Sequence, residues 1–155
     1  MILKLALFGA CLAIYTPHVQ AQSLRLGFYN VENLFDTINS PACNDKEFTP
    51  EGAKNWTAEK YQAKISQLAE VIRAMQCDII GLCEVENESV VEYLAELTDY
   101  DFIHLDTRDS RGMDQALLFR PERFDVERFS LQGNCPRAFL LVEGKSYSMP
   151  LKFIV

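Results

Sequence analysis

The stretch Asp78-Ile79-Ile80-Gly81-Leu82-Cys83-Glu84-Val85-Glu86-Asn87 decides how this chain folds. It begins with a short, nearly continuous apolar run, which is typical of a strand that is buried on both faces. Glu84 follows at the carboxyl end of that strand, where α/β sheets present functional groups to a crevice. The stretch therefore predicts a central buried strand that ends in acidic residues.

The segment before this strand has the features of a helix. Thr57 occupies an N-cap position, Glu59 falls in the first turn, and Trp56 and Tyr61 have the spacing of a hydrophobic staple. Apolar residues recur at steps of four and three, and they predict one stripe that faces a core: Tyr61, Ile65, Leu68, Ile72 and Met75. The polar residues between them are expected to stay in water: Lys60, Lys64, Gln67 and Arg73.

The remaining pattern predicts a layered domain. An alternating strand at residues 24–30 and a loop at 36–55 precede this helix, and a second helix is expected at about 89–97. Short strands are then predicted at 102–105, 115–119, 124–129, 139–142 and 151–155. The 155 residues, of which 48% are hydrophobic, suffice for one core but not for two. We therefore expect a single α/β (α+β) domain over residues 22–155, with helices packed on sheets.

The last predicted strand, 151–155, has no turn, cap or polar tail after it. The pattern is the one expected if the polypeptide was cut within a longer domain, and it would leave an open sheet edge.

The first 21 residues have the pattern of a secretory signal. One lysine precedes an apolar run at residues 5–15, and Val19-Gln20-Ala21 offers the modest side chains that a signal peptidase recognises. A membrane-spanning helix needs about 20 apolar residues, so a membrane anchor is the weaker alternative and we expect no stable membrane insertion. A lipoprotein cleavage box before Cys11 would leave almost no hydrophobic segment upstream. We therefore expect cleavage after Ala21 and a periplasmic or secreted bacterial protein.

The charge of the chain limits its partners. The net charge is -7, and removal of the signal makes the protein one unit more negative because Lys4 is the only charged residue lost. An acidic protein is not expected to bind nucleic acid through overall electrostatic attraction, which requires a face rich in Lys and Arg. Chemistry on phosphate would then rely on local cations, above all a bound metal.

Four cysteines remain after signal removal. Cys77 and Cys83 bracket one predicted strand and would lie roughly 20 Å apart, which is too far for a disulfide. Cys43 and Cys135 both lie in turn-like sequence and could pair. The sequence does not decide between that disulfide and free thiols.

Carboxylates at the end of the buried strand are the first candidates for chemistry. In strand alternation Glu84 and Glu86 share a face, so they could converge on a hard cation such as Mg²⁺ or Mn²⁺. The alternative is that Glu84 only marks where the strand emerges into water. Asn30 ends the first predicted strand, where an amide could orient a phosphate or a water, although Asn at a strand end is also ordinary turn chemistry.

A charged segment precedes the strand predicted at 115–119. It contains Arg108, Asp109, Arg111, Gly112 and Asp114. A guanidinium there could hold phosphate oxygens, and the alternative is a solvated loop with local ion pairs. His104 is expected to be a hydrogen-bonded strand residue, since the sequence offers it no evident partner.

Three segments in order resemble the endonuclease/exonuclease/phosphatase (DNase I-like) family, in its secreted bacterial branch. They are Gly27-Phe28-Tyr29-Asn30-Val31-Glu32-Asn33-Leu34-Phe35-Asp36, Asp78-Ile79-Ile80-Gly81-Leu82-Cys83-Glu84-Val85-Glu86-Asn87 and Arg111-Gly112-Met113-Asp114-Gln115-Ala116-Leu117-Leu118-Phe119-Arg120. The resemblance covers about residues 24–130, and residues 131–155 fit the family poorly. It implies the N-terminal part of a two-sheet sandwich flanked by helices, without the C-terminal half.

The resemblance also implies a function. In the family the Asn that corresponds to Asn30 helps to hold the scissile phosphate, and the Glu that corresponds to Glu84 is the main Mg²⁺ ligand. Arg111 and Asp114 are candidates for substrate binding, and Glu86 is a further candidate metal ligand. The family's later Asp-x-Asn and His motifs have no counterpart in this sequence. We therefore expect part of a metal-dependent phosphoester hydrolase, with a nucleic acid or another phosphoester as substrate; the alternative is a non-catalytic remnant or binding module.

Overall fold

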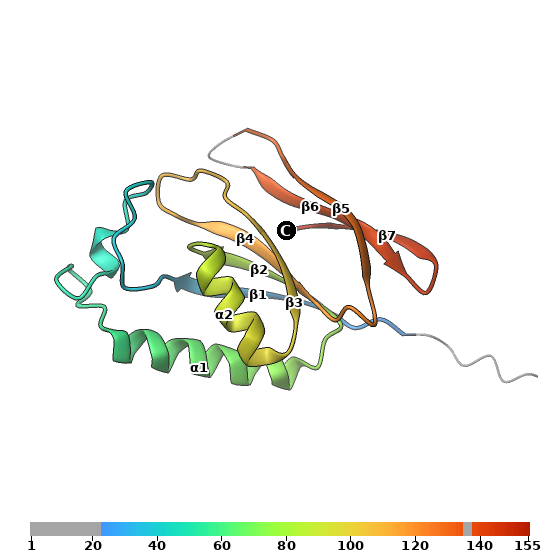
Figure 1. Cartoon of the computed structure of the whole chain (residues 1–155), viewed down its shortest axis with the longest axis horizontal. Coiled ribbons are helices and arrows are strands. Elements are labelled where there is room, and N and C mark those ends of the chain that lie inside the picture. The colour runs from blue at the N-terminus through green and yellow to red at the C-terminus, as the bar shows by residue number, and fades with distance from the viewer. Residues whose placement is uncertain (1–22, 135–137) are drawn as a thin grey trace, which may run out of the picture.

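The computed structural model of the chain describes residues 23–134 and 138–155 (Figure 1). The expected signal peptide, residues 1–21, lies outside the described residues. The architecture is mixed α/β with two β-sheets and few helices, as predicted. This is the arrangement of two sheets flanked by helices that the family resemblance implies.

The first sheet has four strands in the order β1-β2-β4-β3. They are β1 (Leu26–Leu34), β2 (Ile79–Val85), β4 (Asp114–Phe119) and β3 (Asp101–Leu105). β1 and β2 are parallel, whereas β4 is antiparallel to both β2 and β3. β2 is central, and its first four residues are buried, which confirms the predicted buried strand.

Two helices cover one face of this sheet (Figure 1). They are α1 (Ala58–Met75) and α2 (Glu88–Thr98). α1 begins as predicted, because the Thr57 side chain accepts a hydrogen bond from the Lys60 backbone N–H at 3.4 Å. The Asn87 side chain caps α2 in the same way, accepting from the Val90 N–H. The predicted stripe of α1 packs with α2 and the sheet in one core, with Tyr61 and Met75 partly buried at its margin.

The second sheet packs on the opposite face of the first. Its antiparallel strands, in the order β5-β6-β7, are β5 (Asp125–Gln132), β6 (Phe139–Ser146) and β7 (Met149–Ile154). A second core joins the two sheets, and its buried members are Ile79, Ile103, Leu117, Phe119, Phe124, Leu140 and Val142. The molecule is therefore a stack of helices, sheet and sheet.

Two expectations about local structure need correction. The first strand does not end at residue 30: β1 continues to Leu34 through an irregularity in its pairing with β2. The expected loop at 36–55 also contains a short 3-10 helix, η1 (Lys46–Phe48). Both differences arise in the segment that borders the candidate site.

Three cysteines in the described part of the chain, Cys43, Cys77 and Cys83, are free thiols. This confirms that Cys77 and Cys83 do not pair, whereas Cys135 lies outside the described residues. Among the helices that the structure describes, none has the length and apolar character needed to cross a membrane.

Candidate active site

The carboxyl ends of β1 and β2 meet at one edge of the four-stranded sheet. Their parallel pairing sets Asn30 beside Cys83, and the register then slips before Leu34 pairs with Val85. Three residues at this slip have positive φ: Glu32 at 52°, Asn33 at 60° and Glu84 at 66°. Non-glycine residues seldom adopt this conformation, and it tends to be found at functional sites where the surrounding structure holds it in place.

The Glu84 carboxylate is fixed through both of its oxygens. Oε1 accepts a hydrogen bond from the Asn30 side-chain amide at 2.9 Å, and Oε2 accepts one from the Asn33 backbone N–H at 3.1 Å. Asn30 is held in turn, because its Oδ1 accepts from the Glu32 N–H at 2.7 Å. The structure thus brings the two predicted residues, Asn30 and Glu84, into direct contact.

Lys64 supports this arrangement, which the helical pattern did not predict. Its Nζ donates hydrogen bonds to the backbone carbonyls of Glu32 and Asn33, so it fastens the irregular part of β1 to α1. The expectation that Lys64 stays in water is therefore wrong. Burial lowers the pKa of this ammonium, an effect that nearby Glu32 and Glu84 oppose. A lysine on the polar face of a helix gives no sign in the sequence of such a role, because its partners are backbone carbonyls distant along the chain.

Glu86 takes part in a different set of contacts. Its Oε2 accepts from the Asp36 backbone N–H at 2.7 Å, and the residue is 6% exposed. Burial raises the pKa of this carboxyl to about 8, and the negative charges of Asp36 and Asp45 act in the same direction. Because the strand is irregular at Glu84, simple alternation does not describe how the two glutamates lie, and they have no hydrogen-bond partner in common.

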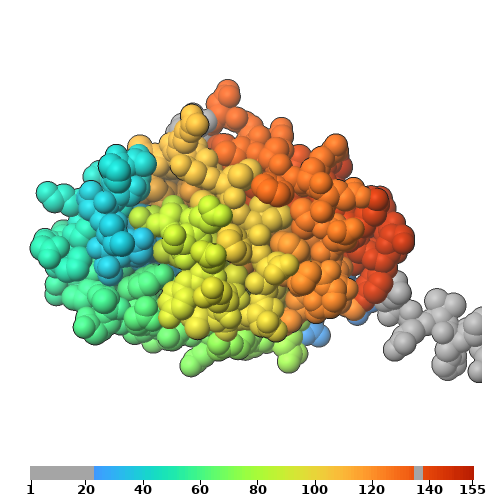
Figure 2. Space-filling view, viewed as in Figure 1, coloured from blue at the N-terminus to red at the C-terminus, as the bar shows by residue number. Residues whose placement is uncertain are grey.

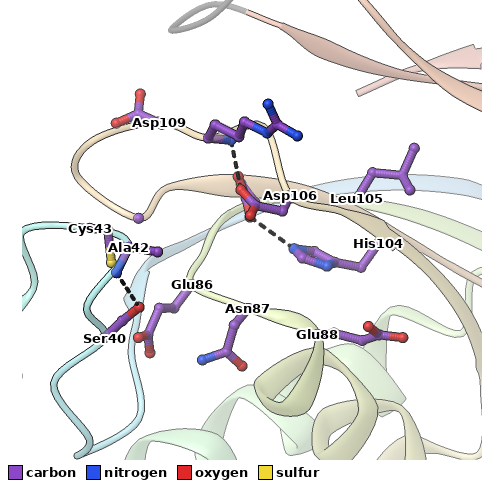
Figure 3. Close-up of a pocket in the computed structure, with 13 residues that line it drawn as sticks. Ser40, Ala42, Cys43, Glu86, Asn87, Glu88, His104, Leu105, Asp106 and Asp109 are labelled. Atoms are coloured by element: carbon purple, nitrogen blue, oxygen red, sulfur yellow. Dashed lines mark hydrogen bonds and ion pairs between the residues drawn. The ribbon is translucent and has the colours of Figure 1, made fainter.

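A cavity of about 560 Å³ lies next to Glu86 (Figure 3). His104 and Asp114 form one wall, and His104 Nε2 lies 3.0 Å from Asp114 Oδ2. Asp114 also accepts from the Thr107 N–H at 2.9 Å and from the Thr107 hydroxyl at 2.6 Å. His104 is thus the hydrogen-bonded strand residue that was expected. Asp114 was expected as a candidate substrate-binding residue; that it is the partner of His104 was not predicted, because the β3–β4 pairing that brings the two together is not visible in the sequence.

Arg111 is paired within its own loop. Its Nε donates to Asp109 Oδ1 at 3.0 Å and one terminal nitrogen donates to Asp109 Oδ2 at 2.9 Å. This contact holds the pKa of Asp109 below its ordinary value. The Arg111 side chain is still 68% exposed, so its outer face remains open to solvent. The ion pair agrees with the alternative of a loop with local ion pairs and leaves one side of the guanidinium accessible.

Two long loops meet around the cavity. The Asn44 N–H donates to the Ser110 carbonyl at 2.8 Å, and Figure 2 shows the two segments in contact at one end of the molecule. The rings of Phe35 and Phe48 stack at 4.0 Å, and the Trp56 indole donates to the Phe35 carbonyl at 3.0 Å. These contacts give the 36–55 loop a core of its own, so it is a fixed border of the cavity.

Several solved structures share this fold. An endonuclease/exonuclease/phosphatase family protein from Bacteroides thetaiotaomicron has a TM-score of 0.60 and 17% identity, covering 87% of this chain and 49% of that chain. A mannosyl-6-phosphatase from the same species has a TM-score of 0.56 and 17% identity, covering 85% and 49%. A humanised TDP2 from D. rerio has a TM-score of 0.57 and 14% identity, covering 84% and 45%. The chain spans about half the length of these structures.

Sequence comparison gives a second result. The sequence profile described as "Endonuclease/Exonuclease/phosphatase family" matches residues 25–155. The expectation that residues 131–155 fit that family poorly is therefore wrong. No individual curated protein matches the chain.

Proposed function

The chain therefore belongs to the endonuclease/exonuclease/phosphatase family, and we propose that it carries the metal-binding part of the active site of a phosphoester hydrolase. The observation that supports this most is the Glu84 carboxylate, which Asn30 and Asn33 hold at the edge where β1 and β2 end. Holding a carboxylate in this orientation costs conformational energy, because Glu84 itself and two residues beside it, Glu32 and Asn33, adopt positive φ. Such an arrangement is expected where a fixed carboxylate is needed for function.

The donor set at this edge suits Mg²⁺ or Mn²⁺. Both ions prefer oxygen ligands, and each Glu84 oxygen makes one hydrogen bond, which leaves lone pairs for a metal. The bound ion would act as a Lewis acid that stabilises charge on the phosphoryl oxygens. Glu84 is the proposed principal ligand. Glu86 is the weaker candidate, since it holds a different hydrogen-bond partner in the loop that follows β1.

The neighbouring residues have proposed roles that follow from their contacts. Asn30 keeps Glu84 in position through one amide N–H and has a second N–H for a phosphate oxygen or a water. The exposed side of Arg111 would bind a phosphate oxygen of the substrate. Asp114 is nearly fully buried and bonds Thr107 and His104, so it acts as a positioning residue behind the substrate surface.

The substrate is proposed at the level of a phosphoester. One structure with this fold is D. rerio TDP2 in complex with a single-stranded DNA product, and another is a mannosyl-6-phosphatase. Nucleic acid and sugar phosphate are therefore both reasonable substrate classes. The acidic net charge favours a substrate that is bound through a few local contacts over a long duplex held by charge.

A second candidate is a non-catalytic remnant or binding module. Within these 155 residues there is no Asp-x-Asn motif and no Asp-His motif, to which the family resemblance assigns the activation of water and the protonation of the leaving group. Groups that act as one catalytic unit fail together when several are missing. We accordingly propose that the 155-residue chain by itself does not hydrolyse phosphodiesters at a measurable rate.

The test is to determine the DNA sequence after the Val155 codon and to express the complete reading frame. The hydrolase proposal predicts Asp-x-Asn and Asp-His motifs downstream, together with Mg²⁺- or Mn²⁺-dependent cleavage of a generic phosphodiester. Glu84→Gln should abolish that cleavage, because a neutral amide is a poor ligand for a hard cation. A stop codon directly after Val155 would favour the binding module. Metal-dependent cleavage by the 155-residue chain, lost in Glu84→Gln, would show that the proposed inactivity is wrong.

We also propose that residues 1–21 direct export to the periplasm or beyond. The support is the sequence pattern alone, a lysine, an apolar run and the Val19-Gln20-Ala21 cleavage region. Mass spectrometry of the exported protein should find an N-terminus at Gln22. An intact Met1 or a lipid on Cys11 would contradict the proposal.

A further inference from the structure

Cys43, Asp45 and Glu86 lie together at one side of the cavity next to β2. One ligand atom from each, the Cys43 sulfur and one carboxylate oxygen from each acid, lies within 4.8 Å of the other two. Figure 3 shows the Glu86 carboxylate turned toward the loop segment that carries Ser40 and Cys43. Cys43 and Asp45 have no role in the proposed chemistry at Glu84. Glu86 is only the weaker candidate ligand for the metal there.

A backbone N–H fixes one oxygen of each carboxylate in this cluster. Asp45 is 2% exposed, and its Oδ2 accepts from the Ser40 N–H at 2.9 Å. Its Oδ1 is buried and has no hydrogen-bond partner among the described residues. The Asp36 N–H holds one oxygen of Glu86, and the Glu86 carboxyl also lies within hydrogen-bonding reach of the Asp45 carboxyl, a contact that needs a proton or a cation between the two groups. A buried carboxylate oxygen without a partner is unfavourable by about 1–3 kcal/mol or more, so an occupant for it is expected.

We propose that Cys43, Asp45 and Glu86 form a second metal site, for a divalent ion that accepts thiolate, of which Zn²⁺ is the leading example. Zn²⁺ takes Cys sulfur at about 2.3 Å and carboxylate oxygen at about 2.0–2.2 Å, and this mixed ligand set suits it better than Mg²⁺, which takes oxygen alone. Ligands of a tetrahedral ion lie roughly 3.5 Å apart, so no two of the three atoms need to approach by more than about 1.3 Å. The ion takes the place of the proton between the two carboxyl groups, and its attraction to both carboxylates draws the ligands together.

The surroundings allow a three-residue site with one open position. Gly112 has φ +69°, and a Cβ there would lie 2.7 Å from the Cys43 sulfur, so only glycine lets this loop pack directly on the thiol. Cys43 and Glu86 both line the cavity, which has room for a water or a phosphate oxygen as a fourth ligand. Three protein ligands and one exchangeable position are the pattern of a zinc site that reacts with or binds a small ligand.

The proposed site is distinct from the one at Glu84, and its test does not depend on hydrolase activity. The purified chain, stripped of metal with a chelator, is titrated with Cd²⁺, which gives a thiolate-to-metal absorption band, and with Zn²⁺ by calorimetry. We expect one Cd²⁺ per chain with the thiolate band. Cys43→Ser should remove the band, and Asp45→Asn should weaken binding by at least about tenfold. Cys83→Ser is the matched control, since Cys83 is a partly buried free thiol outside the cluster, and it should leave the band intact.

Further variants distinguish a metal site at Cys43 from metal binding at Glu84 or Cys83 and from a loss of folding. Glu84→Gln should leave the Cd²⁺ band unchanged, whatever it does to Mg²⁺ binding, so the two sites can fail independently. Circular dichroism of each variant shows whether it is folded; if Cys43→Ser is not, Cys43→Ala takes its place. Absence of the band in the wild-type chain, its loss in Cys83→Ser, or a peptide map that shows Cys43 joined to Cys135 would each overturn the proposal.

Discussion

At the scale of single residues, the proposed metal-binding role of Glu84 depends on the groups that orient its carboxylate. Its two oxygens accept from a side-chain amide and from a backbone N–H, both on β1, and this fixes the carboxylate without neutralising it. A metal ligand that is already in place loses less conformational entropy when the ion binds. Asn30 is therefore as much a part of the proposed metal site as the glutamate that would touch the ion.

Asn30→Ala should weaken Mg²⁺ binding to the chain. The substitution removes the amide that holds Glu84 Oε1, and loss of a group that orients a ligand typically lowers metal affinity by about 10–100-fold. Calorimetric titration with Mg²⁺ measures the effect. Asn39→Ala, an exposed asparagine in the loop after β1, serves as the control and should bind Mg²⁺ as the wild type does. Equal affinity in both variants would mean that Asn30 does not position Glu84.

Asp114→Ala should destabilise the fold, because Asp114 is a structural residue with three hydrogen-bonded contacts. It is 3% exposed, and its loss would leave the Thr107 N–H and the His104 ring without their partner. Removing one member of such a buried polar group costs about 3 kcal/mol. Urea unfolding gives the free energy directly, with Asp125→Ala at an exposed position as the control. A change within about 0.5 kcal/mol of the control would contradict the structural role and reopen direct substrate binding by Asp114.

At the scale of secondary structure, the irregular ends of β1 and β2 make the site. Residues Glu32 and Asn33 turn their carbonyls toward α1, and Lys64 binds both of them. Asn33 uses its N–H to hold Glu84 in the next strand. Hydrogen bonds thus link Lys64 on α1, the irregular end of β1 and the Glu84 carboxylate in one continuous network.

Lys64→Met should remove the hydrogen bonds to the Glu32 and Asn33 carbonyls while preserving α1. Hydrogen bonds from a charged donor contribute about 1.5–3 kcal/mol, so the free energy of unfolding should fall by an amount in that range. Amide hydrogen exchange of Glu32 and Asn33 should also become faster than in the wild type. Gln67→Met, an exposed change on the same helix, should alter neither quantity. Wild-type exchange at Asn33 in the Lys64 variant would show that the lysine is not what holds the bulge.

Glu86 should make stability depend on pH in a defined direction. Its folded-state pKa, about 8, lies above the ordinary value of 4.5, so folding favours the protonated form. The stability linked to this group is complete below about pH 4.5 and is lost as the pH rises through about 8. In chelator-containing buffer, Glu86→Gln should therefore reduce the fall in unfolding temperature between these two pH values. Glu92→Gln, on the exposed side of α2, is the control. An unchanged pH profile in Glu86→Gln would contradict the raised pKa.

The helices and strands of this chain can be predicted from its sequence better than the site can. The spacing of Ile65, Leu68 and Ile72 predicted α1, because a helix that faces a core repeats its apolar residues at steps of three and four. This repeat can be seen in the sequence of the segment alone. The unbroken apolar run of β2 was equally informative. The positions of Asn33 and Lys64 in the site could not be predicted in this way, because they follow from a bulge and from backbone contacts between distant segments.

At the scale of the whole molecule, the chain is a stack of helices, sheet and sheet, which spans about half the length of the structures it resembles. β1 is an edge strand of the first sheet, and its Leu26 and Phe28 are 56% and 63% exposed. The candidate metal residues lie at one end of this same edge region, where β1 and β2 finish.

Mn²⁺ provides the most direct test of the claim that Glu84 is the centre of a metal site. This paramagnetic ion broadens the NMR signals of nearby amides, so substoichiometric Mn²⁺ added to the ¹⁵N-labelled chain reports where the ion binds. The account predicts that signals of residues 30–33 and 83–86 broaden first, and that Glu84→Gln removes this broadening while Glu122→Gln, at an exposed position, retains it. Broadening that is centred away from the ends of β1 and β2, or that persists unchanged in Glu84→Gln, would contradict the account.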